Sequence, residues 1–333
     1  MQMDMRGLLQ VLTSKVQTCS LVVLSSLIAS VHAQTYPSRP VRMIVPASPA
    51  TAPDAFTRTV AQELSARLGQ AFVVENIPGA GGNIATVNVA KAAPDGYTVI
   101  MQLSTFVVNP SLYKNIPYDP VTQFQPVILA ATTITMLGVS TALEGVNSVR
   151  DLIVLSKSGP GQLNYTSSGY GTPPHLRMEI FKHMTGADLT HVPFKTPGDM
   201  VRALVVGDVA AMFNSANGLI PQAKAGKVKL LAVLGPRRWP LAPDVPTMAE
   251  AGFPEYKADI WHGFLTPAGT PREIVRKLNT ELAAVLNAPA VKDTLAKQSI
   301  AATSSTPEEF AEIIKKDLVY WGKVIKEIGI SAE

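Results

Sequence analysis

Cysteine is almost absent from this chain. Of its 333 residues only Cys19 is a cysteine, and it lies before the apolar core of the N-terminal segment, where a lipid-attachment cysteine would not sit. If that segment is removed on export, the remaining chain has no cysteine. Its function then involves no disulfide, no thiol chemistry and no cysteine-ligated metal.

Charged and aromatic residues are also few. They make up 16% and 6% of the chain, and the formal net charge is +4. Without Arg6, Lys15 and Asp4 of the N-terminal segment, 27 basic and 24 acidic residues remain, and the basic ones are scattered. Because a nucleic-acid-binding surface needs a clustered basic stripe with interleaved aromatics, we expect no nucleic-acid partner.

The chain has no apolar run long enough to cross a membrane. The run over residues 21–31 is about 11 residues long, whereas a membrane-spanning helix needs about 20. Arg6 and Lys15 precede this run, and Val31-His32-Ala33 has the small-x-small pattern that signal peptidase cuts. We therefore predict a signal peptide over residues 1–33, cleaved after Ala33. The lack of disulfides fits export to a bacterial periplasm.

Length and composition predict a globular protein of about two domains. Residues 41–45 read as a strand, and the helix that follows has apolar residues at every fourth position and ends at Gly69. Strand 71–75, a helix through Val89 and strand 97–103 complete a β-α-β-α-β unit. Such a unit predicts a parallel sheet.

The same order of elements recurs from residue 162. Two strands and two helices alternate from residue 163 to Val206, and a last strand covers residues 209–213. The loops correspond too, because Thr-Ala-Pro-Asp at 51–54 and Thr-Pro-Pro-His at 172–175 each open a helix. We therefore expect an α/β protein of two lobes, each a mainly parallel sheet flanked by helices.

Two helices are predicted in the C-terminal tail. Each begins with a Thr-Pro-x-Glu sequence, at Thr270 and at Thr306, which is typical of a capping box. The last helix carries an apolar stripe from Phe310 to Ile328, and the simplest partner for this stripe is the first lobe.

Six loops that follow predicted strands are rich in hydroxyls, amides and glycines. Ligands of open α/β sheets bind at such strand ends. Lys195 is the only lysine or arginine in these loops, which cover residues 48–54, 78–83, 104–109, 167–175, 194–199 and 214–218. Helix N-termini bind a carboxylate or phosphate without a dedicated arginine, so an anion site is expected here.

Enzyme motifs are incomplete in these loops. The glycines of residues 79–82 lack the lysine of a Walker loop and the spacing of a dinucleotide fingerprint. Ser168 lacks the glycine that stands two residues before a G-x-S-x-G nucleophile. Because Ser167, Ser168 and His175 are close in sequence, a serine hydrolase stays open as an alternative. The histidines show no metal-ligand spacing, and we expect neither metal nor cofactor.

Several candidate residues have a structural interpretation beside a functional one. Thr172 caps its helix, contacts a ligand, or does both. For Asp54 we favour a stabilising charge in the first turn of a helix, since a carboxylate ligand would be repelled. Lys195 braces its loop or meets the charge of the ligand. His175 is more often a structural imidazole than a titrating one.

Eight stretches spread over the chain match a known family. They are residues 36–42 (YPSRPVR), 74–83 (VENIPGAGGN), 90–97 (AKAAPDGY), 109–113 (NPSLY), 163–169 (LNYTSSG), 191–195 (HVPFK), 223–226 (AKAG) and 243–252 (PDVPTMAEAG). In these stretches the chain resembles the Bug family, the extracytoplasmic substrate-binding proteins of tripartite tricarboxylate transporters. The resemblance implies a two-lobed periplasmic-binding-protein fold that closes on a small organic anion, commonly a carboxylate.

The resemblance also implies where the anion binds, namely at loops 48–54 and 167–175. This chain has Ala50 and Thr51 where the family often has two glycines, and these side chains restrict the loop. Pro53 and the proline pair at 173–174 remove backbone donors. The predicted ligand-binding residues are Ser48, Ala50, Thr51, Asp54, Gly81, Asn83, Ser104, Thr105, Ser168, Gly171, Thr172, His175, Lys195, Asn214 and Ser215.

We predict a monomeric periplasmic solute-binding protein, without enzymatic activity, that delivers a small carboxylate to membrane transporter subunits. The first lobe is expected to comprise residues 34–135 and 260–333, and the second lobe residues 136–259, with hinges near 133–139 and 258–265. A co-receptor for a membrane sensor kinase is the second interpretation, ahead of the hydrolase. Three aromatic residues lie in or beside the loops and suit either an aromatic ligand or plain pocket walls: Phe106, Tyr170 and Phe213.

Overall fold

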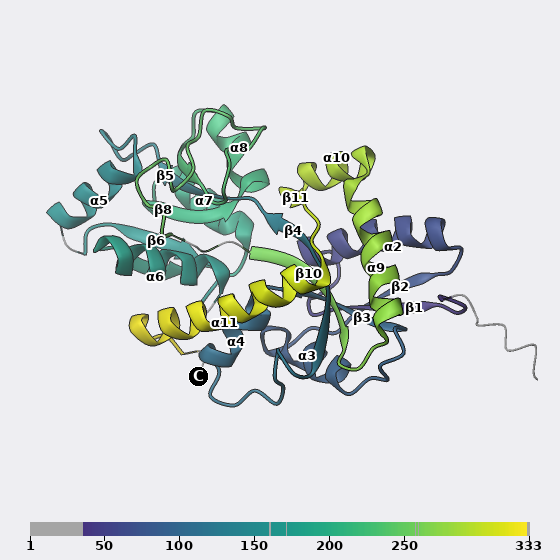
Figure 1. Cartoon of the computed structure of the whole chain (residues 1–333). Coiled ribbons are helices and arrows are strands. Elements are labelled where there is room, and N and C mark those ends of the chain that lie inside the picture. The colour runs from purple at the N-terminus through teal and green to yellow at the C-terminus, as the bar shows by residue number, and fades with distance from the viewer. Residues whose placement is uncertain (1–35, 160, 171, 257, 259, 332–333) are drawn as a thin grey trace, which may run out of the picture. The chain divides into compact units, whose positions relative to one another are not determined.

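The computed structural model describes residues 36–159, 161–170, 172–256, 258 and 260–331 (Figure 1). The predicted signal peptide with its cleavage site after Ala33, Cys19 and the candidate residue Gly171 lie outside these residues. The helices and strands belong to one compact unit that begins at Arg39. Within the described ranges, no helix is long and apolar enough to cross a membrane.

A first sheet of six strands combines parallel and antiparallel pairs within the described residues. In sheet order the strands are β11 (Ile300–Ala302), β4 (Phe124–Thr133), β10 (Ile260–Pro267), β3 (Thr98–Leu103), β1 (Val41–Val45) and β2 (Phe72–Asn76). Strands β1, β2 and β3 pair in parallel, as the β-α-β-α-β pattern predicts. Strand β10 is antiparallel to both β3 and β4, and β11 is antiparallel to β4.

Helices flank this sheet. They are α2 (Ala52–Leu68), the short 3-10 helix η1 (Ala80–Gly82), α3 (Asn83–Ala90), α4 (Thr105–Leu112), α9 (Arg272–Asn287), α10 (Pro289–Lys297) and α11 (Pro307–Ile328). Helix α2 buries Phe56, Val60 and Leu64, which is the spacing that predicted it. Gly69 ends α2 with a φ of 65°, a conformation that glycine adopts without steric cost.

A second sheet repeats the parallel core. Among the described residues its strands are, in order, β7 (Thr190–Pro193), β6 (Asn164–Ser167), β8 (Ala211–Ser215), β5 (Thr135–Ser140) and β9 (Val228–Val233). Strand β6 pairs in parallel with β7 and β8, whereas β5 is antiparallel to β8 and β9. The helices of this part are α5 (Val149–Ser158), α6 (Pro173–Thr185), α7 (Pro197–Val206) and α8 (Ala216–Lys224).

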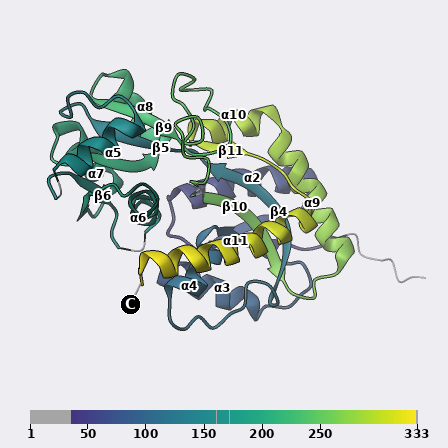
Figure 2. The same ribbon diagram turned by 60° about the vertical axis from the view of Figure 1, so that its left-hand side comes forward.

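The C-terminal tail differs from its prediction in two respects. Thr306 forms the expected capping box with Glu309 at the start of α11. The capping box at Thr270 is wrong, because α9 begins only at Arg272 and the Thr270 hydroxyl donates to the carbonyl oxygen of Pro267 at 2.7 Å. Helix α10 and strand β11 were not predicted either. The apolar stripe of α11 packs on α4 and β4 of the first sheet, as expected, and also contacts α6 (Figure 2).

Two stretches carry the chain between the sheets. Strand β4 ends at Thr133 and β5 begins at Thr135, while the return runs from the end of β9 to the start of β10. The first passage is held by Ser299, whose carbonyl oxygen accepts from the Ile134 N–H at 2.7 Å. The Ser299 hydroxyl accepts from the Asn217 N–H of α8 at 2.5 Å. Ser299, which directly precedes β11, therefore links the passage at Ile134 to α8.

Candidate ligand-binding site

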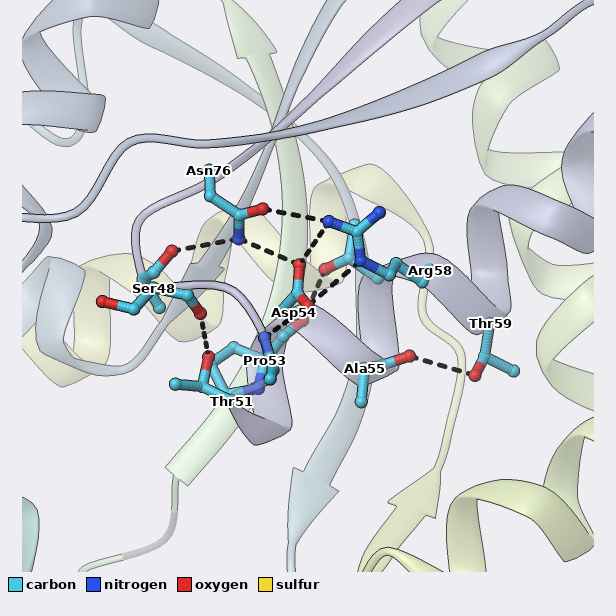
Figure 3. Close-up of polar contacts among 11 residues, drawn as sticks. Ser48, Thr51, Pro53, Asp54, Ala55, Arg58, Thr59 and Asn76 are labelled. Atoms are coloured by element: carbon cyan, nitrogen blue, oxygen red, sulfur yellow. Dashed lines mark hydrogen bonds and ion pairs between the residues drawn. The ribbon is translucent and has the colours of Figure 1, made fainter.

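Asp54 organises the loop between β1 and α2. Its carboxylate accepts hydrogen bonds from the Ala50 N–H at 2.9 Å, from the Arg58 guanidinium at 3.0 Å and from the Asn76 amide at 2.9 Å (Figure 3). Burial favours a raised pKa for this 3% exposed residue, but the three sets of hydrogen bonds outweigh it and the pKa of Asp54 lies below its ordinary value. The ionised carboxylate is thus neutralised within the protein, which supports the structural interpretation.

Thr51 and Thr172 have the same arrangement in the loops that lead into α2 and α6. Each is the N-cap residue of its helix but makes no side-chain cap hydrogen bond, and each hydroxyl turns back into its own loop. The Thr51 hydroxyl donates to the Ser48 carbonyl at 2.7 Å, and the Thr172 hydroxyl donates to the Gly169 carbonyl at 2.6 Å. The prediction that Thr172 caps α6 by its side chain is therefore wrong. Both hydroxyls fix the loop that leads into a helix N-terminus.

Backbone geometry at these helix starts follows the sequence. Ala50 has a φ of 62°, the left-handed region in which glycine is usual, so the chain retains the conformation without the glycine. Pro53 removes the second N–H of α2, and Pro173 and Pro174 remove the first two of α6. Helix α6 therefore has fewer backbone donors left for an anion than α2 has.

Gly81 and Asn83 contact the C-terminal half of α4 and the residues that follow it. The Asn83 side-chain oxygen accepts from the Asn109 amide at 2.7 Å and from the Tyr118 hydroxyl at 3.1 Å. The same Asn109 amide donates to the Gly81 carbonyl at 3.1 Å. A Cβ atom on Gly81 would lie 2.8 Å from the Tyr113 hydroxyl. These contacts give both residues a structural role, and ligand contact by either stays a prediction.

A small cavity lies between α4, which flanks the first sheet, and α6, which flanks the second. Its walls include Ser104, Thr105, Pro173, Arg177 and Trp321. Its volume of about 20 Å³ suits a water molecule rather than an organic ligand. The structure therefore places Ser104 and Thr105 beside the α6 N-terminus, and ligand contact by either stays a prediction.

A larger hollow lies between α7 and α8. It has a volume of about 670 Å³, and Asn214 and Ser215 are among its lining residues. The Ser215 hydroxyl donates to the Asn217 side-chain oxygen at 2.7 Å. Lys195 is exposed and does not line this hollow in the described structure. Two of the six predicted loops, 194–199 and 214–218, thus meet at one concave surface.

Four aromatic rings gather behind the loop from β6 to α6. His191 of β7 stacks on Tyr165 with centroids 4.9 Å apart, and its ring centroid lies 4.6 Å from that of His175. Tyr170 lies over both imidazoles, at 4.8 Å from His191 and 5.1 Å from His175. We call Tyr165, His191, His175 and Tyr170 the ring cluster. His191 was absent from the predicted site, although the register of β6 and β7 sets it opposite Tyr165.

The ring cluster is anchored by polar contacts, and its two imidazoles are uncharged at neutral pH. The Ser167 hydroxyl lies 2.6 Å from His191 Nε2, and the Tyr165 hydroxyl donates to Glu179 at 2.6 Å. Burial, followed by the neighbouring His191, lowers the pKa of His175 to about 4. Burial also lowers the pKa of His191. Both imidazoles are therefore neutral in the folded protein at neutral pH.

The pair of Ser167 and His191 bears on the hydrolase alternative. Ser167 is fully buried, and its hydroxyl also donates to the Gly169 carbonyl at 3.0 Å. His191 Nδ1 is buried and has no hydrogen-bond partner among the described residues, so no carboxylate orients it there. Ser168, the serine considered in the sequence, lies in the same loop and is partly exposed. Ser167, which has a histidine partner, is thus buried where a substrate does not reach it.

Comparisons with known proteins bear on the family and the fold of the chain. The model of the tripartite tricarboxylate transporter family receptor matches residues 56–330. Protein BugT of Bordetella pertussis is 34% identical over 310 residues, which cover 92% of this chain and 95% of BugT.

Two solved structures are similar over nearly their whole length. An R. palustris protein with adipate has 37% sequence identity and a TM-score of 0.75, over 89% of this chain and 99% of that chain. The periplasmic binding protein BugD has 31% identity and a TM-score of 0.72, over 89% and 99%. The two-lobed periplasmic-binding-protein fold predicted from the sequence is confirmed.

Proposed function

Because the chain belongs to the tripartite tricarboxylate transporter receptor family, we propose that it is a periplasmic protein that captures a small organic carboxylate between its two lobes. The observation that carries this proposal is the matched pair of helix starts at α2 and α6. Each follows the carboxyl end of a parallel strand, and each is preceded by a threonine whose hydroxyl orders the loop. Such ends attract anions through the helix dipole.

The two lobes correspond to the two sheets in this proposal. In this proposal residues 34–135 with 260–333 form one lobe and residues 136–259 the other; the second boundary coincides with the start of β10, and the first falls one residue inside β5, which begins at Thr135. Ligand binding favours a closed arrangement of the lobes because the ligand contacts both. The protein acts as a monomer and passes its ligand to the membrane subunits of the transporter. Receptors of this family and fold bind solutes, and no catalytic step is part of the proposal.

A thermal-shift and calorimetry screen tests the function. Purified protein is mixed with aliphatic and aromatic mono-, di- and tricarboxylates and, as controls, with matching amides and alcohols. A carboxylate at about 100 times its Kd stabilises the folded protein by about 2.7 kcal/mol. Binding of one carboxylate class with no product formed supports the proposal. No binding of any carboxylate, or turnover that disappears in Ser168→Ala, contradicts it.

Thr172 offers a sharper test of the site. Thr172→Ala removes the hydroxyl that holds the Gly169 carbonyl, so we expect weaker carboxylate binding with the fold intact. Thr172→Ser retains the hydroxyl and should bind as the wild type does. Unchanged affinity in Thr172→Ala, measured by calorimetry with circular dichroism as the folding control, would remove this residue from the site.

Export and the choice between transport and sensing are tested in cells. Mass spectrometry of the periplasmic fraction should give a mature chain that begins at Gln34. A transport assay in a deletion strain separates a transporter receptor from a co-receptor of a sensor kinase, because only the former is needed for uptake of the ligand.

A further inference from the structure

The hollow between α7 and α8 has the size and the polar groups of an anion-binding pocket. We infer that this hollow supplies the part of the carboxylate site that belongs to the second sheet, and that Arg202 on α7 is the countercharge of the ligand's carboxylate. Arg202 lies outside the six predicted loops and was absent from the predicted ligand-binding residues. The inference rests on the proposed function, since it locates the ligand in that same site.

The hollow is large enough for a small organic acid. Its volume of about 670 Å³ falls within the range of roughly 300 to 1,000 Å³ that is usual for small-molecule pockets. Val201 and Val205 of α7 give it an aliphatic wall. Gly218 of α8 also lines it, and a Cβ atom at this position would lie 2.9 Å from the Asn214 side-chain nitrogen. A glycine inside a helix is unfavourable for the helix, and here it leaves the Asn214 amide in place at the hollow.

The free hydrogen-bonding groups of two side-chain amides in this hollow are donors. The Asn214 side-chain oxygen accepts from the Ser215 N–H at 2.9 Å, and the Asn217 side-chain oxygen accepts from the Ser215 hydroxyl at 2.7 Å. The NH₂ groups of both amides have no hydrogen-bond partner among the described residues. These groups can donate to an anion, whereas a cation would need the oxygens that Ser215 already occupies.

Arg202 carries the only formal charge among the described residues that line the hollow. It is exposed, and its guanidinium forms no hydrogen bond or ion pair with another described residue. Asp199, one turn earlier on α7, accepts from the Thr196 hydroxyl at 2.8 Å and does not line the hollow. An arginine guanidinium offers parallel N–H donors that match the two oxygens of a carboxylate. The charge and the donors of the hollow therefore favour a carboxylate.

Backbone donors beside the second sheet are already used or missing. The Ala216 N–H of α8 donates to the Ile134 carbonyl at 2.9 Å, and the Asn217 N–H donates to the Ser299 hydroxyl at 2.5 Å. The proline pair at 173–174 leaves α6 without its first two donors. Side chains are therefore needed to bind an anion here. Since Ser299 belongs to the first lobe in the proposed division, the Asn217 edge of the hollow lies beside that lobe.

The three aromatic residues considered in the sequence do not line this hollow. Phe106 and Phe213 are fully buried and pack against other aromatic rings of the core. The prediction that all three are available to line a pocket is therefore wrong for these two phenylalanines. Tyr170 is 75% exposed and belongs to the ring cluster, and it lines neither of the two cavities described above.

Calorimetry on charge variants tests the role of Arg202. The probes are acetate, benzoate, succinate, citrate and any further carboxylate that the wider screen detects, with succinamide as an uncharged control. The proteins are the wild type, Arg202→Gln, Arg202→Lys and Arg150→Gln. Arg150 is exposed on α5, does not line the hollow and forms no ion pair with a described residue, so it is the matched control for the loss of one positive charge.

We expect Arg202→Gln to weaken the binding of each carboxylate that the wild type binds by about ten- to hundredfold. Arg202→Lys should lose less, because it retains the charge without the planar fork. Arg150→Gln should stay within about twofold of the wild type, since salt screens a distant exposed charge. Circular dichroism checks the fold of each variant.

A second pair of variants tests the hollow itself without a change in charge. Val205→Trp fills the hollow from α7 and should weaken binding of the same carboxylates. Val206 is the next residue on α7, is 59% exposed and does not line the hollow, so Val206→Trp should bind as the wild type does.

Three results would overturn this inference and leave the proposed function standing: unchanged affinity in Arg202→Gln, equal losses in Arg202→Gln and Arg150→Gln, or equal affinities in the two tryptophan variants. If the wild type binds none of the named carboxylates and none in the wider screen, the proposed function fails, and this inference fails with it.

Discussion

At the scale of single residues, the same kinds of polar side chain stabilise a loop or bind a ligand. Only the hydrogen-bond partners of each side chain show which of the two roles it has. Asp54 and Asn83 are polar residues in glycine-rich or helix-opening loops, and the sequence placed both in the site. In the structure each is nearly buried and satisfied by neighbouring protein groups. Such groups make the loops rigid, which lowers the entropic cost of holding a ligand.

Asp54→Asn tests this supporting role. The change removes the charge that pairs with Arg58 and one acceptor for the Ala50 N–H, so we expect a loss of about 1.5 to 3 kcal/mol in the free energy of unfolding. Urea denaturation measures it. The matched control is Asp95→Asn, which breaks the exposed ion pair with Arg39 and should cost no more than about 1 kcal/mol. Equal losses in the two variants would mean that the loop does not depend on Asp54.

At the scale of helices and strands, local signals predicted the elements better than their ends. The β-α-β-α-β units and the glycine stop of α2 follow from short-range periodicity and steric freedom. The two Thr-Pro-x-Glu sequences are alike, yet only Thr306 forms a capping box. The Thr270 hydroxyl instead donates to the Pro267 carbonyl at the end of β10. Thr270 is only 5% exposed and packs against its own turn.

The contrast between the two threonines is measurable. Thr306→Ala removes a side-chain cap from α11, so we expect a loss of about 1 kcal/mol in the free energy of unfolding. Thr306→Ser should restore most of it, since the serine hydroxyl accepts from the Glu309 N–H in the same way. Chemical denaturation of the three proteins provides the measurement, and an unchanged midpoint in Thr306→Ala would show that the cap is dispensable in the packed helix.

At the scale of the whole molecule, the described structure buries one histidine on α6 beside the second sheet and one in β10 of the first sheet. His262 of β10 is 1% exposed and lies 2.7 Å from the Thr133 hydroxyl at the end of β4. Burial lowers the pKa of His262 to about 4, and it lowers the pKa of His175 to the same value. Protonation of a buried histidine at low pH therefore destabilises both parts of the fold.

Stability should fall as the pH drops from about 6.5 towards 4. In this window the unfolded histidines bind protons and the folded ones do not, so the free energy of unfolding decreases by about 1.4 kcal/mol per pH unit for each such group. Carboxylates with lowered pKa values, such as Asp54 and Glu179, add their effect mainly below this window. Urea denaturation at a series of pH values measures the slope.

Two histidine variants identify the source of this slope. His262→Gln and His175→Gln should each reduce it, because burial lowers the pKa of both imidazoles. A flat stability profile between pH 4.5 and 6.5 in the wild type would contradict the assignment of neutral buried imidazoles.

The sequence by itself determined the order of the elements, the repeated β-α-β wiring and the two helix starts that frame the candidate site. These features depend on periodicity and on contacts within a few residues, which a sequence displays directly. Only the tertiary structure decided that His191 meets Ser167, 24 residues away, that Tyr170 is exposed while Phe106 is not, and that Ser299 links the passage at Ile134 to α8. Such contacts depend on strand order and on the burial of side chains from distant segments, and no local pattern encodes either.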